Sequence, residues 1–181
     1  MPPRIWNTRR QLLGNVIPLV FGVVVGIALF KVGILVRIVA GIVACGLGVN
    51  IWGFFENKKI DRELRNLTLA TGELIGFVFK IPAGMLDAHA EIGILSVDED
   101  QLQIMSERGG VVLRREDVVR LVRRHNIHSI LSLGGWIVLE LKNGTDFRFE
   151  SRMFNTMHMS KLRTDQLFLE LALWHAEKSP A

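Results

Sequence analysis

Residues 11–55 decide the fold of this chain: QLLGNVIPLVFGVVVGIALF (11–30), then KVGILVR (31–37), then IVAGIVACGLGVNIWGFF (38–55). The first and third parts contain no charged side chain and consist mainly of Val, Ile, Leu, Gly and Phe. A bilayer core of about 30 Å needs about 20 apolar residues in a helix, so each part is long enough to cross it. The middle part holds two cations, which would be costly near the centre of one uninterrupted membrane helix. We therefore predict a two-helix transmembrane hairpin that turns at Gly33.

The charges of the chain are unevenly distributed. The 181 residues carry a formal net charge of +4, yet every acidic side chain lies at Glu56 or beyond. Residues 1–55 carry five cations and no acid, whereas residues 56–181 carry 17 basic and 18 acidic side chains and are net −1. The basicity therefore belongs to the apolar part of the chain, which argues against a nucleic-acid-binding protein. The length fits one domain with an appendage, and a hydrophobic content of 49% excludes intrinsic disorder.

The flanks of the two spans carry more Lys and Arg than the loop between them. Three such residues precede the first span and four follow the second within its flank, against two in the loop. The positive-inside rule then places both termini in the cytoplasm. Trp6 and Trp52 are expected near that interface, where amphipathic rings are favoured. A cleaved signal peptide is the alternative for the first span, but its uncharged core is long and a second span follows directly.

Small residues recur at helical spacing in both spans. They are Gly22 and Gly26 on the first span and Ala40, Ala44 and Gly48 on the second. Such residues let helix backbones approach closely where lipid provides no hydrophobic driving force. We expect the contact to join the two helices of the hairpin, and docking against another membrane subunit is the alternative. The spans contain no acidic residue or His, which argues against a proton relay or transporter.

A juxtamembrane helix is predicted after the second span. Ile60, Leu64 and Leu67 recur at i, i+4 and i+7 with charges between them, and Thr71-Gly72 ends the pattern. The predicted organisation is therefore a transmembrane hairpin over 1–55, a juxtamembrane helix or linker over 56–72, and a cytoplasmic domain over 73–181.

The cytoplasmic domain shows strand patterns separated by turns. The expected strands are 73–81, 91–97, 101–107, 111–113, 118–124, 136–141 and 145–150. Pro82-Ala-Gly84 would end the first, Arg115-Glu-Asp117 would form a bend, and Asn143-Gly144 is a strong hairpin signal. A helix is predicted over 160–177. Short strands at this spacing argue for an antiparallel sheet or a partly open barrel, so the fold class is α+β.

This order of elements resembles the pleckstrin-homology (PH) superfold, including its GRAM and bacterial PH-like versions, over about 73–177. GILSVDEDQLQI (93–104) is similar to a family hairpin, VLRREDVVRLV (112–122) to the strand around its bend, and residues 136–149 to the hairpin before its last strand. The resemblance implies an antiparallel β-barrel capped by a C-terminal helix. Two membrane helices ahead of such a domain also occur in bacterial PH-like proteins, which implies a bacterial inner-membrane protein.

The predicted C-terminal helix carries two apolar stripes. One is formed by Leu167, Phe168, Leu171 and Trp174, and a helix that caps a barrel needs only one. The other, Leu162, Leu169 and Leu173, must meet something else. We expect the juxtamembrane helix to cover it, with self-association next and lipid as a further alternative.

Catalytic and metal-binding motifs are lacking. The sequence contains no phosphate loop, HExxH, CxxC or GxSxG, and the single cysteine, Cys45, lies inside the second span. His125 and His128 are three residues apart, with His158 elsewhere, but no acid or cysteine completes a zinc set and Arg123 and Arg124 adjoin them. We predict no enzyme activity, no cofactor and no metal.

One region is rich in arginine: Arg108, Arg114, Arg115, Arg120, Arg123 and Arg124. In lipid-binding PH domains such cations hold phosphoinositide headgroups, so the last five are candidate contacts for a lipid headgroup or a partner. The alternative, which we favour, is a solvated face balanced by Glu107, Glu116 and Asp117. No aromatic side chains alternate with these arginines for base stacking, which again argues against nucleic acid.

Three functions remain open at the level of sequence. The first is a non-enzymatic, membrane-anchored PH-like module that binds a partner protein at the cytoplasmic membrane surface. The second is a structural or accessory subunit of a larger membrane complex, and the third is sensing of anionic lipid through the arginine-rich strand. The predicted partners are membrane lipids around the two helices and a protein, which could be a second copy of the chain.

Overall fold

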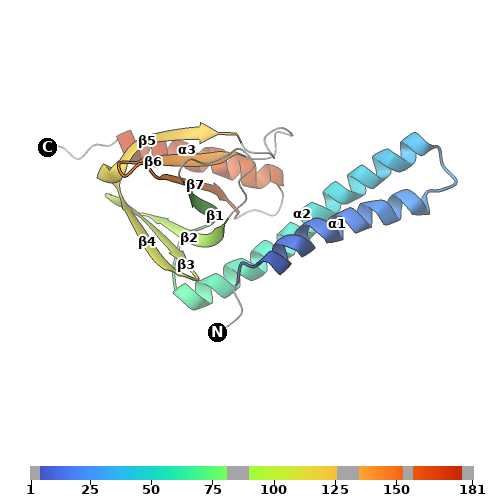
Figure 1. The fold of residues 1–181 in the computed structure, drawn as a ribbon, viewed down its shortest axis with the longest axis horizontal. Helices are drawn as coiled ribbons and strands as arrows, with labels where there is room; N and C mark the ends of the chain where they lie inside the picture. The colour runs from blue at the N-terminus through green and yellow to red at the C-terminus, as the bar shows by residue number, and fades with distance from the viewer. Residues whose placement is uncertain (1–4, 81–89, 126–134, 153–156, 177–181) are drawn as a thin grey trace.

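The structure is a computed structural model that describes residues 5–80, 90–125, 135–152 and 157–176. It combines an N-terminal helical region, a curled antiparallel sheet and a C-terminal helix (Figure 1). The α+β class predicted from the sequence is therefore confirmed. The predicted stop at Pro82-Ala-Gly84 and most of the loop that contains His128 lie outside the described residues.

Two helices form the N-terminal region. Helix α1 spans Thr8–Ala28, and the side chain of Asn7 accepts a hydrogen bond from the backbone N–H of Arg10 (3.0 Å) to cap its start. Helix α2 spans Ile34–Thr68 and ends at Leu69, whose φ of 55° is left-handed. The second apolar segment and the juxtamembrane segment thus form one long helix, and the predicted juxtamembrane helix continues directly out of the second apolar segment. No Gly or Pro interrupts 54–71, so nothing in that sequence stops helix α2 at the boundary.

Seven strands form one sheet in the order β4-β3-β2-β1-β7-β6-β5. They are β1 (Glu73–Lys80), β2 (Glu91–Val97), β3 (Gln101–Ser106), β4 (Gly109–Arg114), β5 (Val118–Arg124), β6 (Trp136–Leu141) and β7 (Asp146–Ser151). All neighbours are antiparallel, and β1 lies at the centre between β2 and β7. The chain crosses from edge strand β4 to edge strand β5 through the short 3-10 turn η1 (Arg115–Asp117), where a bend was predicted.

The hairpin between β6 and β7 turns at the predicted Asn143-Gly144. Gly144 has a φ of 79°, which few side chains tolerate, and its N–H donates to the Leu141 carbonyl (2.9 Å). The Asn143 side chain accepts from the N–H of Thr145 (2.9 Å). Local turn chemistry therefore sets the register of this hairpin.

The main core lies between the concave face of the sheet and helix α3 (Met157–Ala176). Leu167, Leu171 and Trp174 point into it and meet Phe147 and Phe149 from β7. The indole N–H of Trp174 donates to the Asp98 carbonyl (2.8 Å). The first predicted stripe of the C-terminal helix is thus its buried side.

A second cluster lies on the opposite face of the sheet. Ile60 and Leu64 of α2 pack there against Leu74 of β1 and Ile92 and Ile94 of β2. Strands β1 and β2 are therefore covered on both faces, which explains why four consecutive residues of β2 are buried. This contact joins the helical region to the sheet.

Candidate functional site

The exterior of α1 and of the first half of α2 is apolar. Side chains such as Leu12, Val24, Ile42 and Phe55 are each more than half exposed, and they recur along both helices. Both helices are long and apolar enough to cross a membrane, judged by length and composition. Soluble monomers rarely expose a contiguous apolar surface of this extent, which is typical of surfaces that contact lipid or another protein.

Small residues set the contact between α1 and α2, which lie side by side (Figure 1). A Cβ on Gly22 would lie 2.6 Å from the Gly41 carbonyl oxygen, and one on Gly48 would lie 3.2 Å from Cα of Pro18. A Cβ on Gly26 would lie 3.4 Å from the carbonyl oxygen of Arg37. These predicted packing residues therefore meet across the α1–α2 contact. Ala44 is also buried, whereas Ala40 is only half-buried.

Sequence reasoning missed one member of that contact, Gly41, whereas Cys45 was expected as a small packing residue. Gly41 faces Gly22 backbone to backbone, and Cys45 lies 2.9 Å from where a Gly22 Cβ would be. The spacing from Arg37 through Gly41 and Cys45 to Gly48 is helical, so the stripe could have been found by choosing a different register for the second helix.

Ion pairs of Arg10, in the first turn of α1, join the N-terminal segment to helix α2. The guanidinium of Arg10 pairs with Glu56 (3.0 Å) and with Glu63 (2.9 Å), and it also donates to the Ile5 carbonyl (2.7 Å). Arg10 is 16% exposed, so these pairs are shielded from solvent more than ordinary surface pairs.

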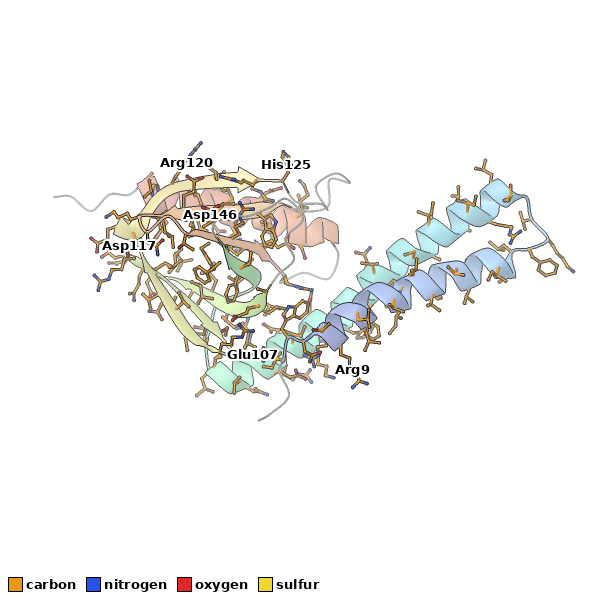
Figure 2. The ribbon with its side chains drawn as sticks, in the orientation of Figure 1. Arg9, Glu107, Asp117, Arg120, His125 and Asp146 are labelled. Atoms are coloured by element: carbon orange, nitrogen blue, oxygen red, sulfur yellow. The ribbon has the colours of Figure 1, made fainter. Side chains whose placement is uncertain are left out.

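Two further contacts join the same segment to the sheet. The carboxylate of Glu107, which follows β3 and lies beside the start of α1 in Figure 2, accepts from the backbone N–H groups of Ile5 and Trp6. The guanidinium of Arg152 lies over the Trp6 ring (4.9 Å) and donates to the side chain of Asn57 on α2 (3.2 Å). Burial lowers the pKa of Arg152, and the charge of Glu150 partly offsets that effect.

We call the set of contacts made by residues 5–10, 56–64, 107 and 152 the junction. It brings together the N-terminal segment, α2 and the sheet from distant parts of the sequence. The structure therefore holds the sheet at one fixed position relative to the apolar helices.

The candidate arginines are mostly paired with carboxylates. Arg114 pairs with Glu116 (3.5 Å), Arg123 with Asp165 of α3 (2.8 Å) and Arg124 with Glu140 of β6 (2.9 Å). Arg115 lies over the Trp174 ring (5.1 Å). Arg120 is exposed on the outer face of β5 (Figure 2). Of the three acids expected to balance these arginines, Glu116 pairs with Arg114, whereas Asp165 and Glu140 pair with Arg123 and Arg124.

These arginines lie at two separate places. Arg114 and Arg115 adjoin Asp117, which lies at the end of the sheet away from α1 and α2 (Figure 2). Arg123 and Arg124 end β5 next to His125, at the opposite end of that strand. The structure does not gather the five predicted residues into one site.

A groove of about 620 Å³ lies at the end marked by Asp117. It is lined by Asp100, Gln101, Arg114, Arg115, Glu116, Val118 and His175. The His175 ring nitrogen Nε2 lies 3.0 Å from the Val118 carbonyl oxygen, a contact that ties α3 to β5. Both signs of charge line the groove, and no Cys or Ser nucleophile is among the lining residues. Within the described part of the chain, no three His, Cys, Asp or Glu side chains are grouped as metal ligands.

Asp165 makes the stability of the domain depend on pH. Burial alone would raise its pKa, but hydrogen bonds and charge from Lys161 and Arg123 together hold it below the ordinary value of 3.8. A carboxylate with a depressed folded pKa stabilises the fold above its unfolded pKa, and this contribution disappears as pH falls through the folded pKa.

We therefore predict that Asp165→Asn lowers the melting temperature of the full chain in detergent at neutral pH. The difference from wild type should begin to shrink as pH falls below 3.8, where the unfolded chain takes up a proton at this carboxylate. It should vanish once pH has fallen through the lower pKa of the folded state, where the wild-type carboxylate is protonated in both states. Thermal unfolding followed by circular dichroism across this range measures it. If the difference in melting temperature between wild type and Asp165→Asn does not change with pH, the ionised carboxylate of Asp165 is not what stabilises the fold.

The second stripe of α3 is uncovered. Leu162, Leu169 and Leu173 are 43%, 62% and 68% exposed, and Met159 beside them is 44% exposed. The expectation that the juxtamembrane helix covers this stripe is wrong, because the end of α2 packs on the other face of the sheet (Figure 1).

Comparisons with known proteins found no match in sequence and two distant likenesses in structure. No family model and no curated protein matches the chain. One similar solved structure is the C-terminal domain of an unknown protein from Leishmania infantum, with 11% identity, a TM-score of 0.40, and coverage of 66% of this chain and 98% of that one. Another is Inner Membrane Complex Sub-compartment Protein 1 from Toxoplasma gondii, with 17% identity, a TM-score of 0.36, and coverage of 65% and 90%. Neither likeness is close enough to support an argument about function.

Proposed function

We propose that the chain is a non-enzymatic, membrane-anchored module whose PH-like domain binds a partner protein at the cytoplasmic membrane surface. The observation that carries this proposal is the construction of helix α2. Its first half exposes side chains such as Ile42 and Phe55 that suit lipid, and its second half buries Ile60 and Leu64 in the domain. One rigid helix thus connects an apolar region to the domain.

The cytoplasmic orientation is supported by the charges around that helix. Arg9, Lys58, Lys59 and Arg62 are exposed close to the domain end of the apolar region, where anionic headgroups would attract them. The curled seven-stranded sheet with its C-terminal helix supports the PH-like assignment, and the resemblance implies a bacterial inner-membrane location.

The partner surface that we propose is the uncovered stripe of α3, formed by Leu162, Leu169 and Leu173. Apolar side chains exposed at helical spacing are the usual contact residues of helix-mediated recognition. The arginines support lipid sensing less well. Arg114 and Arg115 lie at the end of the domain away from the apolar helices, and Arg123 and Arg124 already pair with carboxylates.

Site-specific photo-crosslinking in native membranes tests this function. A photo-reactive residue at Leu169 should give one discrete product with another protein, whereas the same residue at Lys142, which is exposed on the β6–β7 hairpin, should not. Equal labelling from both positions, or none from Leu169, would remove the proposal.

A structural subunit of a larger complex is the second candidate, and the exposed α3 stripe together with the apolar helices favours it as well. Extraction in a mild detergent followed by sizing separates the two. A discrete large assembly that survives extraction supports the structural subunit, and a chain that loses its partner on extraction supports the module.

A further inference from the structure

An apolar groove of about 530 Å³ runs between α1 and α2, away from the sheet. Gly22, Gly26 and Gly41 line it where the two helix backbones approach each other closely. Its other walls are aliphatic side chains such as Leu19, Ile38 and Ile42. A groove of this kind, open on one side, suits a hydrocarbon chain.

One cation lines this groove. The Nε of Arg37 donates to the Gly26 carbonyl oxygen (3.1 Å), one of the carbonyls near the end of α1 that lack a helical partner. This bond holds the guanidinium at the loop end of the groove. No acidic residue occurs before Glu56, so residues 1–55 supply no counter-charge for Arg37.

We propose that the groove binds one anionic phospholipid, with its phosphate on the Nη groups of Arg37 and an acyl chain along the glycine-lined wall. This inference rests on the proposed insertion of α1 and α2 in a membrane. An arginine near the end of a membrane helix extends its guanidinium to the interface, where a lipid phosphate lies at the same depth and matches its paired donors. A third helix in the groove would need its own carboxylate at that depth.

Native mass spectrometry of the full chain tests the inference. The chain is released from bilayers that contain equal amounts of phosphatidylglycerol and phosphatidylethanolamine. Wild type should retain one phosphatidylglycerol, and Arg37→Gln should reduce retention by about tenfold or more, as expected for one hydrogen bond to a charged group. Lys31→Gln is the matched control, because Lys31 lies over Phe30 and does not line the groove.

A second variant tests the same site without changing Arg37, in case Arg37→Gln loses the lipid because it misfolds. Ile38→Trp fills the groove and keeps Arg37, so it should also lose the lipid. Equal retention by Arg37→Gln and wild type, equal binding of both lipids, or a polypeptide that occupies the groove would each overturn the inference.

Alkaline carbonate extraction distinguishes two outcomes: the lipid site is wrong but the helices are in the membrane, or the helices are not in the membrane at all. A chain that stays in the membrane but retains no lipid overturns only the lipid site. A chain that washes out of the membrane overturns the proposed insertion as well.

Discussion

Ile60→Ala is expected to destabilise the full chain by about 2–5 kcal/mol, the usual cost of removing a large aliphatic side chain from a packed interior. Ile60 is fully buried between α2 and the sheet, against Leu64, Leu74, Ile92 and Ile94. The loss should appear as a lower melting temperature in detergent. It should also appear as faster proteolysis of the segment that joins α2 to β1, because the cavity weakens the contact that holds the two together.

Leu67→Ala is the control for this prediction. Leu67 lies two turns further along the same helix but is 60% exposed, so its truncation should change stability by less than about 0.5 kcal/mol. Equal effects of the two substitutions would mean that α2 does not dock on the sheet as described.

Val43→Arg is expected to cost about 2.5–3.5 kcal/mol of membrane insertion, because an arginine near the centre of a transmembrane helix is unfavourable by that amount. Val43 lies in the apolar half of α2 and is 55% exposed. The fraction of chain that resists alkaline carbonate extraction should fall accordingly.

The same substitution at Val119 is a matched control. Val119 is 61% exposed on β5, so Val119→Arg places an equally accessible cation on the domain and should leave carbonate resistance unchanged. If Val43→Arg and Val119→Arg leave carbonate resistance equally unchanged, the apolar surface of α2 faces water and the proposed membrane insertion is wrong.

Local patterns predicted most of the elements of this fold. The alternation in β3, the turn at Asn143-Gly144 and the buried stripe at Leu171 depend on nearby residues, and each lies where it was expected. It was harder to predict which small residues of α1 and α2 face each other. Glycine is so frequent in both spans that several different helix faces carry small residues at helical spacing. This is why Gly41 was missed.

The junction could not be predicted because its contacts join distant residues. Nothing near Glu107 indicates that it will accept hydrogen bonds from the backbone at Ile5 and Trp6. The same holds for Arg152, which meets Trp6 and Asn57. Such contacts depend on how the whole fold brings the segments together.

The acidic partners of the arginines could not all be predicted either, because some of these ion pairs also join residues that are distant in the sequence. Arg123 is balanced by Asp165 from the C-terminal helix, and no local pattern connects the two. Sequence reasoning named acids that are near in sequence, of which Glu116 pairs with Arg114, but it could not name Asp165 and Glu140, which are distant in sequence.

The central claim is that α1 and α2 cross a membrane and return, so that the domain and the connection between the helices lie on opposite sides. Cysteine labelling measures this most directly. In a Cys45→Ser background, one variant carries Gly33→Cys between the helices and another carries Glu116→Cys on the exposed end of the domain.

A membrane-impermeant maleimide is then added to intact cells that express each variant. The account predicts labelling of the Gly33→Cys chain in intact cells, and labelling of the Glu116→Cys chain only after the membrane is permeabilised. Labelling of both positions from the same side would contradict it.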